Sequence, residues 1–231
     1  MIVVLIAAAS VPFQLHEKGR DVEFRYRWAA EASVIPTLQR ELRAELERDR
    51  ARTAARARAD RLAALKANYP FHQHFFDRNV TFGGQSARLA SFADQRSTYT
   101  GGAHPNPGTT AILWDRRRGA ATSFAALFRN SPGAILRPAY CKGLAAERQR
   151  KMGSAKPSGA YWDACPDPLK LTVIPEDKNR DGRFDTINVT ADPYAVGSYA
   201  EGYYIVMLPV TRALIAALKP EYRASFEAQR Q

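Results

Sequence analysis

The chain has 231 residues and a mass of 25.7 kDa, and 45% of its residues are hydrophobic, so it can bury a substantial core and is not a disordered protein. Its 34 basic and 23 acidic side chains give a net charge of +11, which attracts anionic polymers and surfaces. The basic residues are scattered along the chain instead of forming one compact tract, so nucleic-acid binding is not predicted.

An apolar run covers Met1 to Ser10, and the first charged residue is Glu17. The run is too short to span a bilayer and lacks the charged start of a complete signal peptide. We interpret residues 1–20 as the leader-like remainder of a signal peptide, with an apolar first strand as the alternative. No later stretch reaches the length of a transmembrane helix, so the mature chain is predicted not to span a membrane.

Residues from Asp21 to Trp28 alternate between apolar and charged side chains, a pattern that predicts a strand. A long helix is predicted from Pro36 to Lys66, because proline suits a first helical turn and leucines then recur every fourth residue. Leu62 and Leu65 return to one face near its end. Interleaved acidic side chains favour a solvated, ion-paired outer face over a binding helix.

Turn residues separate six further apolar segments, which we predict to be short strands. Their ranges are 79–82, 87–94, 109–115, 169–175, 186–190 and 203–209. Short helices are predicted at 123–128 and 210–218, and a loop at Gly153–Gly159. This order predicts an α+β fold, with mostly antiparallel sheets packed against one long N-terminal helix and short peripheral helices.

Cys141 and Cys165 are the two cysteines of the chain. An even number suits a disulfide, and the Gly- and Pro-containing stretch between them could bring them together. Two unpaired buried thiols are the alternative. Together with the apolar start, the pair favours an oxidising, periplasmic or secreted location.

The segment from Asp177 to Asp185 has the spacing of a calcium loop, with glycine at its sixth position. The candidate structural Ca²⁺ ligands are Asp177, Asn179, Asp181, the carbonyl of Arg183, and Asp185. Position 12 is Asn188 in a strand-like sequence, so an EF-hand is not predicted. A turn capped by its own side chains is the alternative.

The sequence contains none of the motifs of nucleophilic catalysis, nucleotide binding or zinc hydrolysis that we considered. His72 and His74 would share one face of a strand, but no third ligand stands at zinc spacing. An enzyme is therefore the minority interpretation.

Two segments carry a family resemblance: Tyr99-Thr-Gly-Gly-Ala-His-Pro-Asn106, and Pro193 to Gly202 followed by an apolar strand. They resemble the RsiV-type domain of unknown function, found in the extracytoplasmic lysozyme-sensing part of the anti-sigma-V factor and, with a strand-helix module, in PdaC-like deacetylases. The resemblance implies a PdaC-like strand-helix-strand module at 21–95 and an RsiV-like domain at 96–231, packed as one unit.

The resemblance also implies a non-enzymatic cell-envelope module that binds a peptidoglycan-related glycan or a lysozyme-like protein. The binding residues that it suggests are Tyr99, Gly101, Gly102, His104, Asn106, Tyr194, Tyr199 and Glu201. In the alternative, an envelope hydrolase or deacetylase, His104 and Glu201 would be the acid-base pair. The two motifs could equally serve the fold, because glycine and proline shape turns. Two basic proteins repel, which argues against an ordinary basic lysozyme as the ligand.

Overall fold

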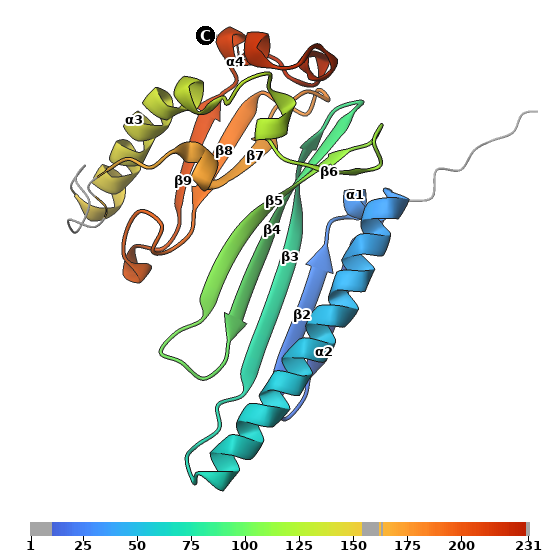
Figure 1. The fold of residues 1–231 in the computed structure, drawn as a ribbon, viewed down its shortest axis with the longest axis vertical. Coiled ribbons are helices and arrows are strands. Elements are labelled where there is room, and N and C mark those ends of the chain that lie inside the picture. The colour runs from blue at the N-terminus through green and yellow to red at the C-terminus, as the bar shows by residue number, and fades with distance from the viewer. Residues whose placement is uncertain (1–10, 154–161, 163, 230–231) are drawn as a thin grey trace, which may run out of the picture. The chain divides into compact units, whose positions relative to one another are not determined.

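The computed structural model describes residues 11–153, 162 and 164–229, so the apolar run Met1–Ser10 and most of the predicted loop Gly153–Gly159 lie outside the described residues. The strands are β1 (Phe13–Lys18), β2 (Val22–Trp28), β3 (His74–Gln85), β4 (Leu89–Tyr99), β5 (Asn106–Asp115), β6 (Ala120–Thr122), β7 (Thr172–Glu176), β8 (Thr186–Ala191) and β9 (Tyr204–Pro209). The α-helices are α1 (Ala30–Ser33), α2 (Pro36–Lys66), α3 (Gly133–Met152) and α4 (Arg212–Ala217). Figure 1 shows these elements along the chain.

The strands form two sheets, and the predicted α+β fold is confirmed. A six-stranded mixed sheet has the order β1-β2-β3-β4-β5-β6, and a three-stranded antiparallel sheet has the order β7-β8-β9. Strand β2 pairs antiparallel with β1 and parallel with β3, and α2 connects the parallel pair. In the described part of the chain, no helix is long and apolar enough to cross a membrane.

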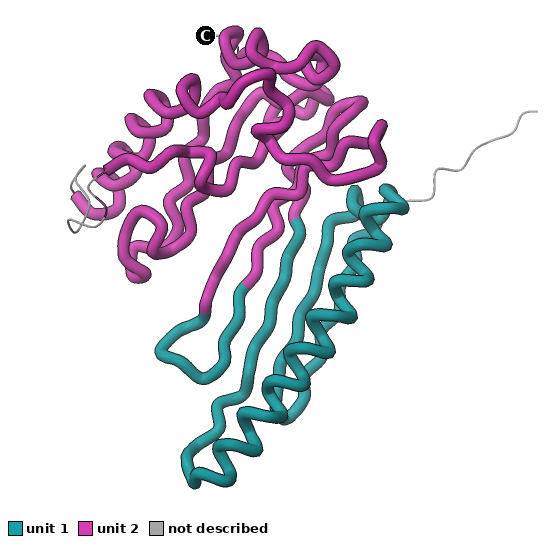
Figure 2. The backbone as a smooth tube through the Cα atoms, in the orientation of Figure 1, with its two compact units in different colours: residues 1–80, 97–105 teal, residues 81–96, 106–231 magenta. Residues whose placement is uncertain are grey.

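The chain divides into two compact units (Figure 2). Unit 1 comprises residues 1–80 and 97–105, and unit 2 comprises residues 81–96 and 106–231. Strands β3 and β4 each contribute residues to both units. The bounds of the units therefore differ from those of the predicted modules, which are 21–95 and 96–231. The predicted module boundary remains a prediction.

In unit 1, α2 lies along β2 (Figure 1) and buries the leucines at the predicted spacing of four. The buried helix residues are Leu38, Leu42, Leu46, Asp49, Ala57 and Ala64. Strand β2 supplies Phe24, whose ring stacks on Phe76 of β3 at 4.9 Å. Leu62 and Leu65 stay exposed, because alanines occupy the buried face at that end of the helix.

Residues 13–18, which belong to the segment expected to be a leader, form strand β1. The ring of Phe13 stacks on Trp28 at 3.8 Å, and Arg50 of α2 binds Glu17. This part of the predicted leader is therefore a strand of the sheet.

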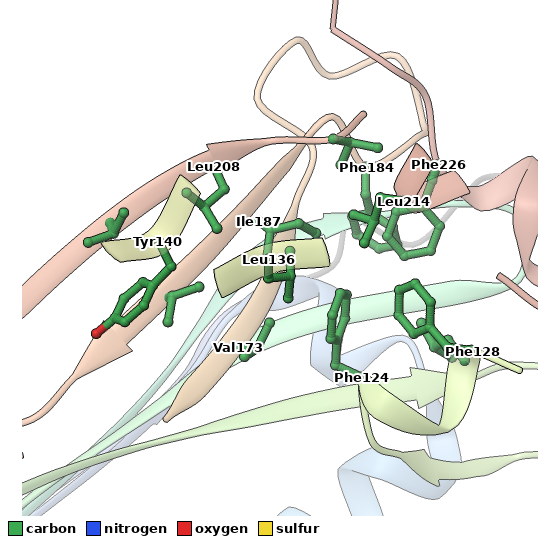
Figure 3. Packing of buried hydrophobic residues seen from close by; sticks show 14 of the residues in the cluster. Phe124, Phe128, Leu136, Tyr140, Val173, Phe184, Ile187, Leu208, Leu214 and Phe226 are labelled. Atoms are coloured by element: carbon green, nitrogen blue, oxygen red, sulfur yellow. The ribbon is translucent and has the colours of Figure 1, made fainter. Parts of the chain in front are cut away.

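Unit 2 has a hydrophobic core between α3, the β7-β8-β9 sheet and the C-terminal turns (Figure 3). Leu136 and Tyr140 of α3 face this core together with Ile187 and Leu208. Helix α3 was not predicted. The six predicted strand segments all overlap observed strands, 210–218 contains α4, and 123–128 contains only a 3-10 turn at Ala125–Leu127.

Candidate functional site

Residues 193–202 make up most of the connection between β8 and β9, and we call them the 193–202 loop; they include two tyrosines. Tyr194 is 54% exposed, and its ring lies 5.7 Å from that of Tyr199, at an interplanar angle of 38°. Tyr194 has φ of 72°, a left-handed conformation that is costly for a bulky residue. We call Tyr194 and Tyr199 the aromatic pair.

Two cations of α3 hold the loop by its carbonyl groups. Lys151 Nζ donates to the carbonyl oxygens of Glu201 and Tyr203, and its ammonium lies 4.5 Å from the centre of the Tyr204 ring. The buried Arg148 donates to the carbonyl of Val196 at 2.9 Å. Helix α3 therefore fixes the backbone of the loop, and this preorganises the aromatic pair.

Glu201 has a structural role in this loop. Its carboxylate accepts hydrogen bonds from the Ser198 backbone N–H and from the Tyr204 hydroxyl. Burial, followed by the hydrogen bond to Glu201, raises the pKa of Tyr204 to about 12. Glycine at position 197 leaves room for this carboxylate, because a Cβ atom would lie 2.5 Å from a Glu201 carboxylate oxygen and would force the side chain to move.

The segment Tyr99–Asn106 contains the last residue of β4, the turn at residues 100–105 and the first residue of β5. Gly101 has φ of 93°, a backbone conformation that favours glycine. His104 Nδ1 lies 2.9 Å from the carbonyl oxygen of Pro105, a contact within the turn. Gly102 has open space around it.

The predicted binding residues fall into both compact units. Tyr99, Gly101, Gly102 and His104 belong to unit 1, whereas Asn106, Tyr194, Tyr199 and Glu201 belong to unit 2. Within unit 2, the structure brings together the aromatic pair and Glu201. The proposed acid-base pair is divided between the units, and the Glu201 carboxylate already binds two groups of its own loop.

The predicted calcium loop consists of consecutive turns, and carboxylates of the loop accept hydrogen bonds from its backbone N–H groups. The Asp177 carboxylate accepts from the backbone N–H groups of Asp181 and Gly182, and the Asp185 carboxylate accepts from the N–H of Lys178. A pocket between this loop and the C-terminal segment is lined by Asn179, Asp181, Arg183, Asp185, Glu227, Ala228 and Gln229. Asn188 lies in β8, as expected for a loop that is not an EF-hand.

Arg183 faces the carboxylates of this pocket with its guanidinium group. It donates to Asp181 at 3.0 Å and also pairs with Glu227. Among the described residues, no group of three or more His, Cys, Asp or Glu side chains is placed to hold a metal ion. Calcium binding at the five predicted ligand positions remains a prediction.

Cys141 and Cys165 form a disulfide in the structure. The bond ties α3 to the segment that precedes β7, and both sulfur-bearing side chains pack against the hydrophobic core of unit 2. Arg137 of α3 reinforces the link by donating to the carbonyl of Cys165 at 2.8 Å.

Three residues that support the aromatic pair were missed at the sequence level. Arg148 and Lys151 belong to the unpredicted α3, and Trp162 donates its indole N–H to the carbonyl of Tyr194. No local sequence signal marks them, because the carbonyl groups that Arg148 and Lys151 bind lie 48 and 50 residues further along the chain.

Comparisons with known proteins agree with this architecture. No family model and no curated protein matches the chain. A DUF3298 family protein from Pseudomonas aeruginosa is 16% identical with a TM-score of 0.55, over 95% of this chain and 97% of that chain. A DUF3298 member from Bacteroides fragilis is 12% identical with a TM-score of 0.61, over 93% of this chain and 95% of that chain. At these identities the likeness shows the fold, which is shared with proteins of an uncharacterised domain family.

Proposed function

We propose that this protein is a periplasmic or secreted, non-enzymatic binding module of the cell envelope, as the resemblance to RsiV-type domains implies. Its ligand is a peptidoglycan-related glycan, and the aromatic pair is the contact surface. The observation that carries the proposal is the exposed Tyr194 held at φ of 72°. Backbone strain at an exposed aromatic side chain is typical of a functional position.

The chemistry of the loop fits a saccharide. One face of a sugar ring is lined by C–H groups and packs against an aromatic face, while its hydroxyl groups remain solvated. In the aromatic pair, the exposed Tyr194 ring lies 5.7 Å, centroid to centroid, from the ring of Tyr199, on a loop fixed by Lys151 and Arg148. Peptidoglycan fragments also carry carboxylates, which a chain with net charge +11 attracts.

A titration with soluble peptidoglycan fragments tests the proposal, with Tyr194→Gly as the variant. Glycine adopts the same φ without strain, so this change removes the ring and keeps the loop. Affinity should fall about tenfold or more, as for other anchoring aromatic residues. Met207→Ala alters another exposed side chain of unit 2 and should leave affinity unchanged.

Equal affinity of the wild type and Tyr194→Gly for these fragments would exclude the aromatic pair as the contact surface. Absence of binding by the wild type, at concentrations up to about a millimolar, would exclude the glycan as ligand. Binding to a lysozyme that Tyr194→Gly abolishes would point instead to a protein partner.

A further inference from the structure

A second exposed surface lies at the C-terminal end of α2, in unit 1. Leu62 is 52% exposed, Leu65 is 66% exposed, and Tyr69, just beyond the helix, is 53% exposed. Single exposed hydrophobic residues are ordinary, but here three large ones lie within eight positions at one helix end. We call these three residues the helix-end patch.

The fold keeps this patch away from the core. Ala57 and Ala64 occupy the buried face of α2 at this end, and Arg61 binds Asp21 on that side. Leu62 and Leu65 stand three residues apart on the helix and therefore share an exposed face, which lies beside the buried alanine face.

Cations lie beside the patch. Arg58 and Lys66 are exposed and stand one helical turn before and after Leu62. Neither forms an ion pair within the described residues, whereas Arg50, Arg52 and Arg56, nearer the helix start, pair with acidic side chains. The helix-end patch therefore offers apolar side chains and one aromatic hydroxyl, and two cations without an acidic partner among the described residues flank it on the helix.

We propose that the helix-end patch docks on an anionic phospholipid surface. Leucines enter the boundary between headgroups and acyl chains, tyrosine favours the same interface, and cations bind the phosphates. A second copy of the chain fits less well, because face-to-face patches would bring like charges together. The proposal is independent of the glycan site, which lies in unit 2.

Co-sedimentation of the full chain with vesicles tests this proposal. We expect binding to vesicles of equal parts phosphatidylglycerol and phosphatidylcholine, weak binding to phosphatidylcholine alone, and weaker binding at higher salt. Leu62→Ser with Leu65→Ser should abolish sedimentation. Arg58→Gln and Lys66→Gln should each lower the partition coefficient about fivefold.

Arg40→Gln with Arg48→Gln is the matched control, because it removes two exposed charges of the same helix away from the leucines. This control should bind clearly more tightly than Arg58→Gln with Lys66→Gln. Equal loss in both double variants would show a general attraction without a docking site and would overturn the proposal. Self-association that the leucine variant abolishes would identify a second copy as occupant and would also overturn it. Melting curves and peptidoglycan titrations of each variant check folding and the separate glycan site.

Discussion

The exposed Tyr194 has a left-handed backbone conformation, and the free-energy cost of that conformation can be measured. A non-glycine residue in this conformation loses about 1–2 kcal/mol, while glycine costs about 0.5–1 kcal/mol in unfolded-state entropy. Tyr194→Gly should therefore unfold within about 1 kcal/mol of the wild type in urea. Tyr194→Val, which is β-branched, should be clearly less stable. If Tyr194→Val were as stable as Tyr194→Gly, the backbone at this position would carry no strain.

His74 links the stability of unit 1 to pH. Its side chain is 2% exposed, and burial lowers its pKa below the ordinary 6.5, although Asp60 at 3.3 Å opposes the shift. The unfolded state then binds the proton more tightly than the folded state. The stability from neutral His74 is fully present above about pH 6.5 and is lost as pH falls through the folded pKa.

We therefore predict that the melting temperature falls between about pH 7 and about pH 5, and that His74→Phe flattens this dependence. Phenylalanine keeps an aromatic ring beside Phe71 and does not titrate. The measurement is a series of thermal melts of both proteins over that range. A wild-type profile that stays flat, or one with the same slope in both proteins, would contradict the assignment.

At the scale of elements, the disulfide between Cys141 and Cys165 closes a loop with a sequence separation of 24. Closing such a loop restricts the unfolded chain and is worth about 3 kcal/mol. Cys141→Ser with Cys165→Ser should therefore lower the free energy of unfolding by about that amount, measured in urea. Reductant should shift the wild-type curve toward the double variant and leave the variant unchanged; no shift would mean that the bond does not stabilise the fold.

For the loop from Asp177 to Asp185, thermal melts can distinguish calcium binding from capping by the loop's own groups. If calcium binds, it relieves repulsion among the carboxylates and raises the melting temperature, with a weak Kd on the order of 10⁻⁴ to 10⁻³ M. If the observed capping by backbone N–H groups and by Arg183 suffices, calcium does nothing. The measurement is a set of thermal melts of the wild type and Asp181→Ala in EGTA, calcium and magnesium. We expect calcium alone to raise the melting temperature, and only that of the wild type. Equal melting temperatures in all conditions would leave the calcium site without support.

Local patterns made β2 and α2 predictable, because alternation and leucine spacing follow directly from strand and helix periods. Helix α3 was not predictable in this way, since Pro138 and Gly143 interrupt its pattern. Gly143 has a tertiary reason: a Cβ atom there would lie 2.3 Å from a methyl group of Val206. The aromatic pair could be named from the sequence, but its support by Lys151 could not, because it depends on α3.

At the scale of the whole molecule, the net charge of +11 makes association rates depend on ionic strength. Association with anionic peptidoglycan fragments should slow as salt rises, because screening weakens the attraction. Association with a basic lysozyme, if it occurs, should become faster. Stopped-flow or surface-based rates over a salt series measure both trends. A lysozyme rate that fell with salt would show a local acidic docking patch strong enough to override the net charge.

The parallel pairing of β2 with β3 has a kinetic consequence. Val22 is paired with His74, so this contact joins residues 52 positions apart (74 minus 22), with α2 between them. Closing so long a segment costs chain entropy before any strand contact forms, whereas a helix assembles from neighbours within about a microsecond. In refolding, α2 should therefore form first and shorten the distance that the chain must search. The rate at which unit 1 acquires its sheet then depends on residues of α2 that never touch β3.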